Sequence, residues 1–278
     1  MPWKYSEEYY REYTKNTWNE SAEAYVRLLT NFEPFRTDLL GSVRPVAGQR
    51  ILDLATGPGE PALTLARAVG GTGHVTGVDL SERMVAISRR VAADRGLANV
   101  DFQVMDCGAL AFPDATFDAV TCCFGFQIFT DPEKAAREAH RVLRPGGQLG
   151  VLVWSTGDKV PFLDAIIGPM LEGAEPDENG YLPTPYETGG PGEMVAFLPA
   201  AGFEHAQERR VQHSMSFRDP DDYLNALLKA TPIGHSLSEE DVPTQAEILR
   251  KTRANLERWK TTEGVVLPAE GVVVTARK

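Results

Sequence analysis

The sequence has few cysteines and no long apolar run. These two features argue against a disulfide-rich protein, a zinc protein and a membrane-spanning protein. Its three cysteines are Cys107, Cys122 and Cys123. An odd number of thiols, two of them adjacent, fits neither a disulfide framework nor a zinc-ligand spacing. No apolar stretch approaches the roughly 18 residues that a membrane-spanning helix needs, and the polar segment from Met1 to Arg11 lacks a signal-peptide core. We therefore expect a cytoplasmic protein with reduced thiols, no metal site and no membrane span.

Positive charge is also scarce. The 278 residues include 28 Lys and Arg against 39 Asp and Glu, which gives a formal net charge of -11. Because no run of Lys or Arg offers a footprint for a phosphate backbone, nucleic acid is not an expected partner. The remaining composition, with 42% hydrophobic and 24% charged residues, is that of a globular protein. A chain of this length can bury one enlarged α/β core with additional helices.

From Gln49 onward, short apolar runs alternate with segments of helical period. This alternation predicts βαβ units and a mostly parallel sheet. The expected strands are residues 50–54, 74–78, 100–105, 117–123 and 148–154. Ser81 is expected to cap one intervening helix, and Asp131 followed by Pro132 is expected to start another.

The pattern loosens after Trp154. The expected helices there are residues 162–171, 219–229 and 244–260, and the expected strands are 203–217 and 271–276. A strand that follows helices at the end of the chain predicts an antiparallel hairpin that completes the same sheet. We therefore expect three parts: a helical cap over 1–46, a cofactor-binding core over 47–154, and a substrate lid with the final strands over 155–278.

The sharpest local motif is LDLATGPGE at residues 52–60, a strand that ends in a glycine-bearing turn before a helix. Gly57 and Gly59 remove side chains, so the backbone can approach a ligand, and the helix start offers N–H groups to an anion. Asp79 ends the next expected strand, where a carboxylate can accept both hydroxyls of a ribose. Asp106 ends the third strand and can accept an adenine amino group. Together they predict a nucleoside site.

This turn leaves two cofactors open. Gly57, Gly59 and Ala62 also satisfy the looser dinucleotide pattern G-x-G-x-x-A. A nicotinamide-dependent oxidoreductase that uses the same turn and Asp79 is therefore a competing hypothesis at this point.

Two further segments, FPDATFDAV at 112–120 and FGFQIFTDPEKAAREAHRVLRPGG at 124–147, resemble class I S-adenosylmethionine-dependent methyltransferases. The resemblance is greatest to the ubiquinone/menaquinone-biosynthesis C-methyltransferase family and covers residues 50–154. It implies a doubly wound, mostly parallel seven-stranded sheet with helices on both faces. It also implies methyl transfer from S-adenosylmethionine, with S-adenosylhomocysteine as product, to a small aromatic, quinone-like or natural-product acceptor. A non-methylating protein of the same fold that binds S-adenosylmethionine remains an alternative.

The resemblance also implies a set of cofactor-binding residues. Ala55 departs from the superfamily, which most often has glycine there, and Cys107 is a milder departure. Tyr25 and Phe124 are included because aromatic faces attract a sulfonium. The full set is Tyr25, Asp53, Ala55, Gly57, Gly59, Asp79, Leu80, Met84, Asp106, Cys107 and Phe124.

The acceptor is expected on the lid side, because the matched region is occupied by the cofactor. Apolar walls with few polar groups are usual for such sites. The predicted acceptor residues are Phe126, Gln127, Phe162, Tyr181, Tyr186, Phe197 and His235. His213 and His235 are the candidates for a general base, since an imidazole can take a proton near neutral pH.

Overall fold

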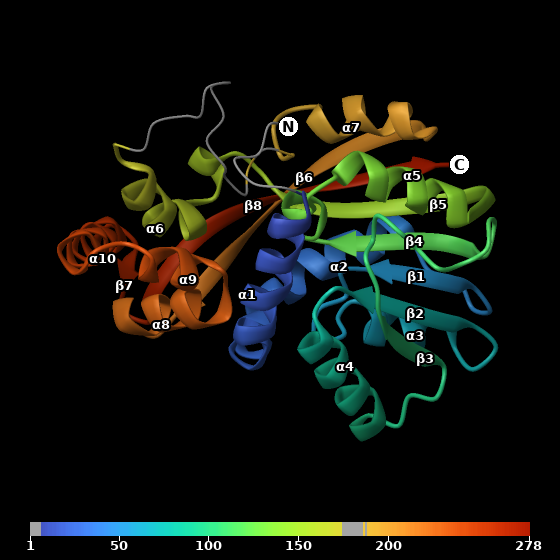
Figure 1. The fold of residues 1–278 in the computed structure, drawn as a ribbon, viewed down its shortest axis with the longest axis horizontal. Helices are drawn as coiled ribbons and strands as arrows, with labels where there is room; N and C mark the ends of the chain where they lie inside the picture. Colours follow the sequence, from blue (N-terminus) through green and yellow to red (C-terminus); the bar gives the residue numbers. More distant parts are fainter. Residues whose placement is uncertain (1–6, 174–185, 187) are drawn as a thin grey trace.

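β1 (Arg50–Leu54) lies inside a mixed sheet whose strand order is β3-β2-β1-β4-β5-β8-β6 (Figure 1). This computed structural model describes residues 7–173, 186 and 188–278. The other strands are β2 (His74–Asp79), β3 (Val100–Val104), β4 (Phe117–Cys123), β5 (Leu143–Trp154), β6 (Glu204–Phe217), β7 (Lys260–Thr261) and β8 (Gly264–Arg277). Strands β1 to β5 pair in parallel, and β8 pairs antiparallel with both β5 and β6.

The predicted fold class is confirmed, including the antiparallel hairpin that completes the sheet. Two predicted strand starts were wrong: β8 begins at Gly264 rather than at residue 271, and β5 begins at Leu143 rather than at 148. The predicted seven strands form the main path of the sheet, and the two-residue β7 pairs with β8 beside it.

The helices cover both faces of the sheet. They are α1 (Glu7–Leu28), α2 (Glu33–Val43), α3 (Ala62–Val69), α4 (Glu82–Asp94), α5 (Pro132–Val142), α6 (Pro161–Leu171), α7 (Glu193–Phe197), α8 (Pro220–Ala230), α9 (Ile233–Ser238) and α10 (Val242–Glu257). Side chains alternate along the buried strands, so Ile51 packs into the core beneath α2 and α3, whereas Leu52 packs into the core beneath α5. The predicted caps are present: Ser81 Oγ accepts from Met84 N, and Asp131 Oδ1 accepts from Lys134 N.

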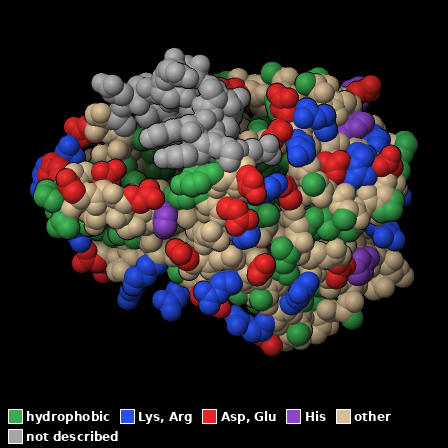
Figure 2. Space-filling model, viewed as in Figure 1, with side chains coloured by type: hydrophobic (Ala, Val, Ile, Leu, Met, Phe, Trp, Pro, Cys, Tyr) green, Lys and Arg blue, Asp and Glu red, His purple; other side chains and the backbone are tan. Residues whose placement is uncertain are grey.

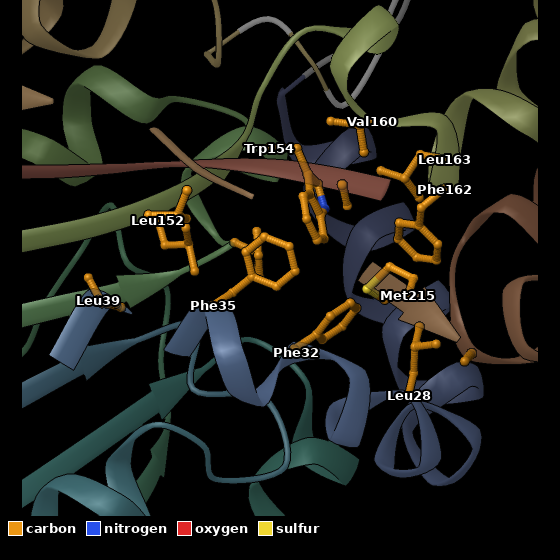
Figure 3. Close-up of a cluster of buried hydrophobic side chains, with 14 of the residues drawn as sticks. Leu28, Phe32, Phe35, Leu39, Leu152, Trp154, Val160, Phe162, Leu163 and Met215 are labelled. Carbon is orange, nitrogen blue, oxygen red and sulfur yellow. The ribbon is translucent and has the colours of Figure 1, made fainter. Parts of the chain in front are cut away.

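The hairpin of β6 and β8 continues past the end of β5. Trp154 pairs with Gly271 at the end of the β5–β8 ladder, whereas β6 and β8 stay paired as far as Phe217 and Val265. Helices α6, α8 and α10 gather around this extension (Figure 1). Aromatic side chains join the two regions, because Phe32 lies 5.7 Å from Trp154 and 6.3 Å from Phe162, ring centre to ring centre (Figure 3). The sheet and helices α6, α8 and α10 therefore contribute to the same hydrophobic core.

The expected N-terminal cap consists of two helices that pack differently. α2 packs on the sheet, where a Cβ at Gly150 would stand 2.2 Å from Val43 Cγ2. α1 instead packs against α8 and α4, away from the strands (Figure 1). Among the described residues, no helix is long and apolar enough to cross a membrane.

Gly150→Ala should lower the free energy of unfolding by about 1–3 kcal/mol, because the added methyl group forces α2 off the sheet. Gly71→Ala is the matched control, since nothing lies within 4 Å of a Cβ there. Urea unfolding measures both. Equal stability of the two variants would contradict this packing of α2.

Candidate functional site

A cavity opens at the carboxyl ends of β1, β2 and β4, beneath α1. It encloses about 950 Å³, part of it open to solvent. Most of the predicted cofactor residues line it: Tyr25, Ala55, Gly57, Asp79, Leu80, Met84, Asp106, Cys107 and Phe124. Strand ends far apart in the sequence therefore meet at one site, as a parallel sheet requires.

The carboxylate of Asp79 is held by two main-chain donors. Gly57 N donates to Oδ2 and Ser81 N donates to Oδ1, each at 2.8 Å. Burial raises the pKa of Asp79 to about 6, because desolvation disfavours the charged form more than these donors favour it. Each oxygen keeps a second lone pair, so the carboxylate can still accept two hydroxyls of a ribose.

Asp106 stands at the other end of the cavity. Its Oδ1 accepts from Gly108 N at 2.7 Å, and Arg11 Nη1 lies 3.4 Å from its Oδ2. Burial raises the pKa of the adjacent Cys107, so its thiol stays protonated. Leu80 and Met84 add apolar surface to the same wall. Carboxylate and flat apolar faces together suit an adenine ring.

The ends of β1 and β4 are strained. Ala55 has φ +49° and Phe124 has φ +61°, a left-handed conformation that costs side-chain-bearing residues about 1–2 kcal/mol. Between them, a Cβ at Gly125 would stand 2.7 Å from Ala55 Cβ and 2.6 Å from Cys122 Sγ. The two strand ends approach so closely that residue 125 has room only for glycine.

Two predicted cofactor residues, Asp53 and Gly59, do not line the cavity. Asp53 is fully buried beneath the turn, where Thr121 Oγ1 donates to its Oδ1 at 2.6 Å and burial raises its pKa to about 7. Gly59 has φ +110°, and a Cβ there would stand 2.8 Å from Leu63 Cδ1. Both residues therefore support the turn and the start of α3 without lining the cavity.

Aromatic rings from the cap and the sheet surround the middle of the cavity. Tyr25 lies edge-on to Trp18 at 5.2 Å, and both rings line the cavity. Phe124 stacks on Trp154 at 4.0 Å. Burial raises the pKa of Tyr25, which keeps its hydroxyl neutral. Such rings exclude water and favour a cation at their faces.

Several residues that line the cavity are not among the predicted site residues. From α1 come Arg11, Thr14 and Trp18, and from the segment after β4 come Ile128, Phe129, Thr130, Asp131 and Lys134. Arg11 and Lys134 lie on helices rich in charged residues. The sequence alone does not show which of these charged side chains faces the cavity and which faces solvent.

The described members of the predicted acceptor set do not line this cavity. Phe126 is 1% exposed and packs with Phe197 in the core beneath α5, while Phe162 is buried in the other core. Gln127 Oε1 accepts from Trp154 N at 2.8 Å. Tyr186 is half-buried, with its pKa raised by burial and by Asp164. Tyr181 falls outside the described residues.

Neither predicted histidine base lines the cavity. His213 Nε2 lies 2.6 Å from Asp38, and its ring lies edge-on to Phe35. His235 is on α9, where Glu20 and Glu239 lie 3.8 and 3.7 Å from its ring nitrogens. His213 is therefore packed against α2, and His235 lies between α9 and α1.

Comparisons with known proteins agree with this geometry. The family described as "Methyltransferase domain" matches residues 51–147. The demethylmenaquinone methyltransferase of Thermus thermophilus is 40% identical over 197 residues, which cover 63% of this chain and 86% of that protein. This chain belongs to the S-adenosylmethionine-dependent methyltransferase family. The oxidoreductase hypothesis is thereby rejected.

Two other relatives of this methyltransferase are ubiquinone/menaquinone biosynthesis C-methyltransferases. That of Methylobacterium nodulans is 32% identical over 63% of this chain and 74% of its own length. That of Hydrogenovibrio crunogenus is 44% identical over 42% of this chain, and the match spans 45% of its length.

Solved structures share the fold of this methyltransferase. Phosphoethanolamine N-methyltransferase 2 of Haemonchus contortus, in complex with S-adenosyl-L-methionine, superposes with a TM-score of 0.61 at 19% identity, over 97% of this chain and 60% of that one. The [4+2]-cyclase SpnF superposes with a TM-score of 0.56 at 25% identity, over 88% of this chain and 80% of that one.

The residues of the cavity fit S-adenosylmethionine. Asp79 suits the ribose, Asp106 with Leu80 and Met84 suits the adenine, and the aromatic rings suit the sulfonium. The missing side chain at Gly57 lets the backbone approach the methionine portion.

Asp79→Asn should raise the dissociation constant for S-adenosylhomocysteine about 10- to 150-fold, because a charged acceptor of ribose hydroxyls is lost. Asp94→Asn, on the exposed end of α4, is the matched control and should bind like the wild type. Isothermal titration calorimetry compares the three proteins. Equal affinity of wild type and Asp79→Asn would remove Asp79 from the ribose site.

The pH dependence should have opposite signs for stability and for binding. The pKa of Asp79 is about 6 in the folded chain against an ordinary 3.8, so its contribution to stability is present below about pH 4 and lost as pH rises through about 6. Ribose binding needs the ionised carboxylate, so affinity for S-adenosylhomocysteine should fall as pH drops through about 6. Calorimetry of wild type and Asp79→Asn across this range tests the assignment. A wild-type affinity that does not change with pH contradicts it.

Proposed function

We propose that this methyltransferase transfers the methyl group to a ring carbon of a reduced quinone-like aromatic acceptor. The similarity to the demethylmenaquinone methyltransferase of Thermus thermophilus, at 40% identity over 86% of its length, carries this proposal. The apolar side chains that line the cavity, among them Trp18, Phe124, Ile128 and Phe129, support a flat apolar acceptor.

The chain has mainly to position two reactants and exclude water. S-adenosylmethionine supplies, when bound, an electrophilic methyl group on a sulfonium. Asp79 and Asp106 hold the nucleoside in place. The strained ends of β1 and β4 fix the position of Phe124 in the cavity wall. α1 closes the site from above through Asn19, whose Oδ1 accepts from Ser81 Oγ at 2.7 Å. Most of the rate enhancement then comes from holding the acceptor carbon in line with the methyl–sulfur bond at a short distance.

The acceptor is proposed to enter between α1 and the start of α5 rather than from the lid side. Arg11 and Lys134 line this part of the cavity. Among the described residues, no carboxylate lies within ion-pair distance of Lys134, and Arg11 reaches Asp106 only at 3.4 Å. Two such cations favour an acceptor that carries an oxyanion. In a hydroquinone they lower the pKa of a ring hydroxyl, and the resulting phenolate makes the adjacent ring carbon nucleophilic.

Methyl transfer is tested directly with S-adenosylmethionine labelled in the methyl group and a panel of reduced naphthoquinones and benzoquinones. The expected product gains one CH2 in mass at a formerly unsubstituted ring carbon and keeps both hydroxyls. Quinols without a free ring carbon are the control. Products methylated on oxygen would overturn carbon transfer. The fold is shared with a [4+2]-cyclase, so cofactor binding without any methylated product would favour a non-methylating role.

Lys134→Gln should lower kcat/KM for a quinol acceptor about 10-fold or more, because one charge-assisted contact to the phenolate is lost. The pH at which activity rises should move upward, since the phenol pKa is less depressed. Affinity for S-adenosylhomocysteine should change less than about 2-fold if the two sites are energetically separate. Lys229→Gln, on the exposed side of α8, is the charge-matched control. An unchanged pH profile in Lys134→Gln contradicts the assignment.

A further inference from the structure

Arg11 and Asp106 form an ion pair at one end of the cofactor cavity. Arg11 Nη1 lies 3.4 Å from Asp106 Oδ2, and both residues line the cavity. Arg11 is on α1, whereas Asp106 lies just after β3, and both side chains are partly exposed. A contact of this length is weaker than an ordinary N–H···O bond, and ion pairs between partly exposed groups contribute little to stability. Either partner can therefore be exchanged for another at low cost.

The two oxygens of the Asp106 carboxylate have different partners. Oδ1 accepts from Gly108 N at 2.7 Å, which fixes the carboxylate to its own turn. Among the described residues, Arg11 is the only hydrogen-bond partner of Oδ2. An adenine amino group that binds this carboxylate therefore meets the guanidinium of Arg11 at Oδ2. Both donors carry positive charge, so each weakens the binding of the other at a shared oxygen.

The charge of Arg11 has few competing partners. Among the residues that the structure describes, no carboxylate other than that of Asp106 lies within ion-pair distance of Arg11. In the middle of Figure 2, where α1 lies, acidic and basic side chains are mixed. The described side chains around α1 therefore provide no uniformly basic surface, and an oxyanion is attracted there by single cations at the cavity.

The backbone of α1 is anchored away from Arg11. Asn19 lies about two turns further along the helix. Its Oδ1 accepts from Ser81 Oγ at 2.7 Å and from Arg83 N at 3.2 Å, which holds α1 against the start of α4. An arginine side chain is long and has several rotatable bonds, so it can change partner while the helix stays fixed. An exchange of partners by Arg11 therefore needs only a change of rotamer.

We infer that Arg11 couples the two substrates by exchanging partners, so that the cofactor binds first. Before the cofactor binds, Arg11 pairs with Asp106; once the adenine occupies Asp106, the guanidinium is released to the oxyanion of the acceptor. This rests on the proposed function, which places the acceptor beside Arg11. An acceptor that arrives before the cofactor meets a cation that is already paired. Cofactor and acceptor should therefore raise each other's affinity by the same factor.

The first measurement uses the cofactor product alone. Arg11→Gln should bind S-adenosylhomocysteine about 2- to 5-fold more tightly than the wild type, because the adenine no longer displaces a guanidinium. Lys15→Gln is the matched control and should bind like the wild type, since Lys15 lies on the same helix, pairs with Glu12 and does not line the cavity. Isothermal titration calorimetry compares the three proteins. Weaker binding by Arg11→Gln would mean that Arg11 covers the adenine, and unchanged binding would mean that it does not compete. Either result would overturn the inference.

The second measurement uses 2-hydroxy-3-methyl-1,4-naphthoquinone, which is an oxyanion at neutral pH and has no free quinone-ring carbon to methylate. The wild type should bind it about 5-fold or more tightly with saturating S-adenosylhomocysteine than without. In Arg11→Gln this ratio should fall to that of 2,3-dimethyl-1,4-naphthoquinone. This neutral analogue has the same rings, so it measures any direct contact between cofactor and ring.

An oxyanion ratio that is the same in wild type and Arg11→Gln would overturn the inference and leave the proposed acceptor class intact. If the wild type binds neither naphthoquinone in the presence of S-adenosylhomocysteine, the acceptor does not occupy this cavity. The proposed function then fails together with the inference, which is a different result. Each ratio is measured within one protein, so a partial loss of stability does not obscure it.

Discussion

The cavity depends on one carboxylate, that of Asp79, which joins two neighbouring strand ends. Asp79 accepts from Gly57 N in the turn after β1 and from Ser81 N at the start of α4. It therefore fixes the distance between two neighbouring strand ends before any ligand binds. The two main-chain donors offset part of the cost of burying this charge, and desolvation still raises the pKa of Asp79. The carboxylate is therefore already oriented, and each of its oxygens can still accept one further donor.

Backbone strain at the neighbouring strand ends has a related role. Ala55 and Phe124 both adopt left-handed conformations, and Gly125 is the close contact between them. The stacking of Phe124 on Trp154 and the pairing of β1 with β4 hold these conformations in place. The cavity wall that carries Phe124 is thus held in place by the sheet.

Most residues that the sequence proposes for the cofactor lie together around the cavity, because the signals that point to them are local. Strand ends, glycines and acids follow one another within short stretches, and a parallel sheet brings such ends to one edge. The described residues that the sequence proposes for the acceptor do not line the cavity, because their positions depend on packing between distant segments. Phe126, Phe162 and Phe197 have the same apolar character in a core as in a pocket, and here they are core residues.

Long-range pairs account for the other differences. His213 was a candidate base by its place in the sequence, but Asp38, which lies 175 residues away, occupies its ring nitrogen. Arg11 reaches the cavity only because α1 crosses from α8 to α4. The early start of β8 has the same origin, since those residues pair with β6 after the helices have returned to the sheet.

The segment that contains helices α8 to α10 begins and ends side by side. Phe217 at the end of β6 pairs with Val265 near the start of β8. The two ends of this excursion are held side by side by the hairpin, so the entropy of closing it changes slowly with its length. The segment is nevertheless anchored between its ends, because Tyr223, Leu227 and Leu256 lie in the same hydrophobic core as Trp154 of β5. The length of the excursion is therefore limited by packing and not by the cost of closing the loop.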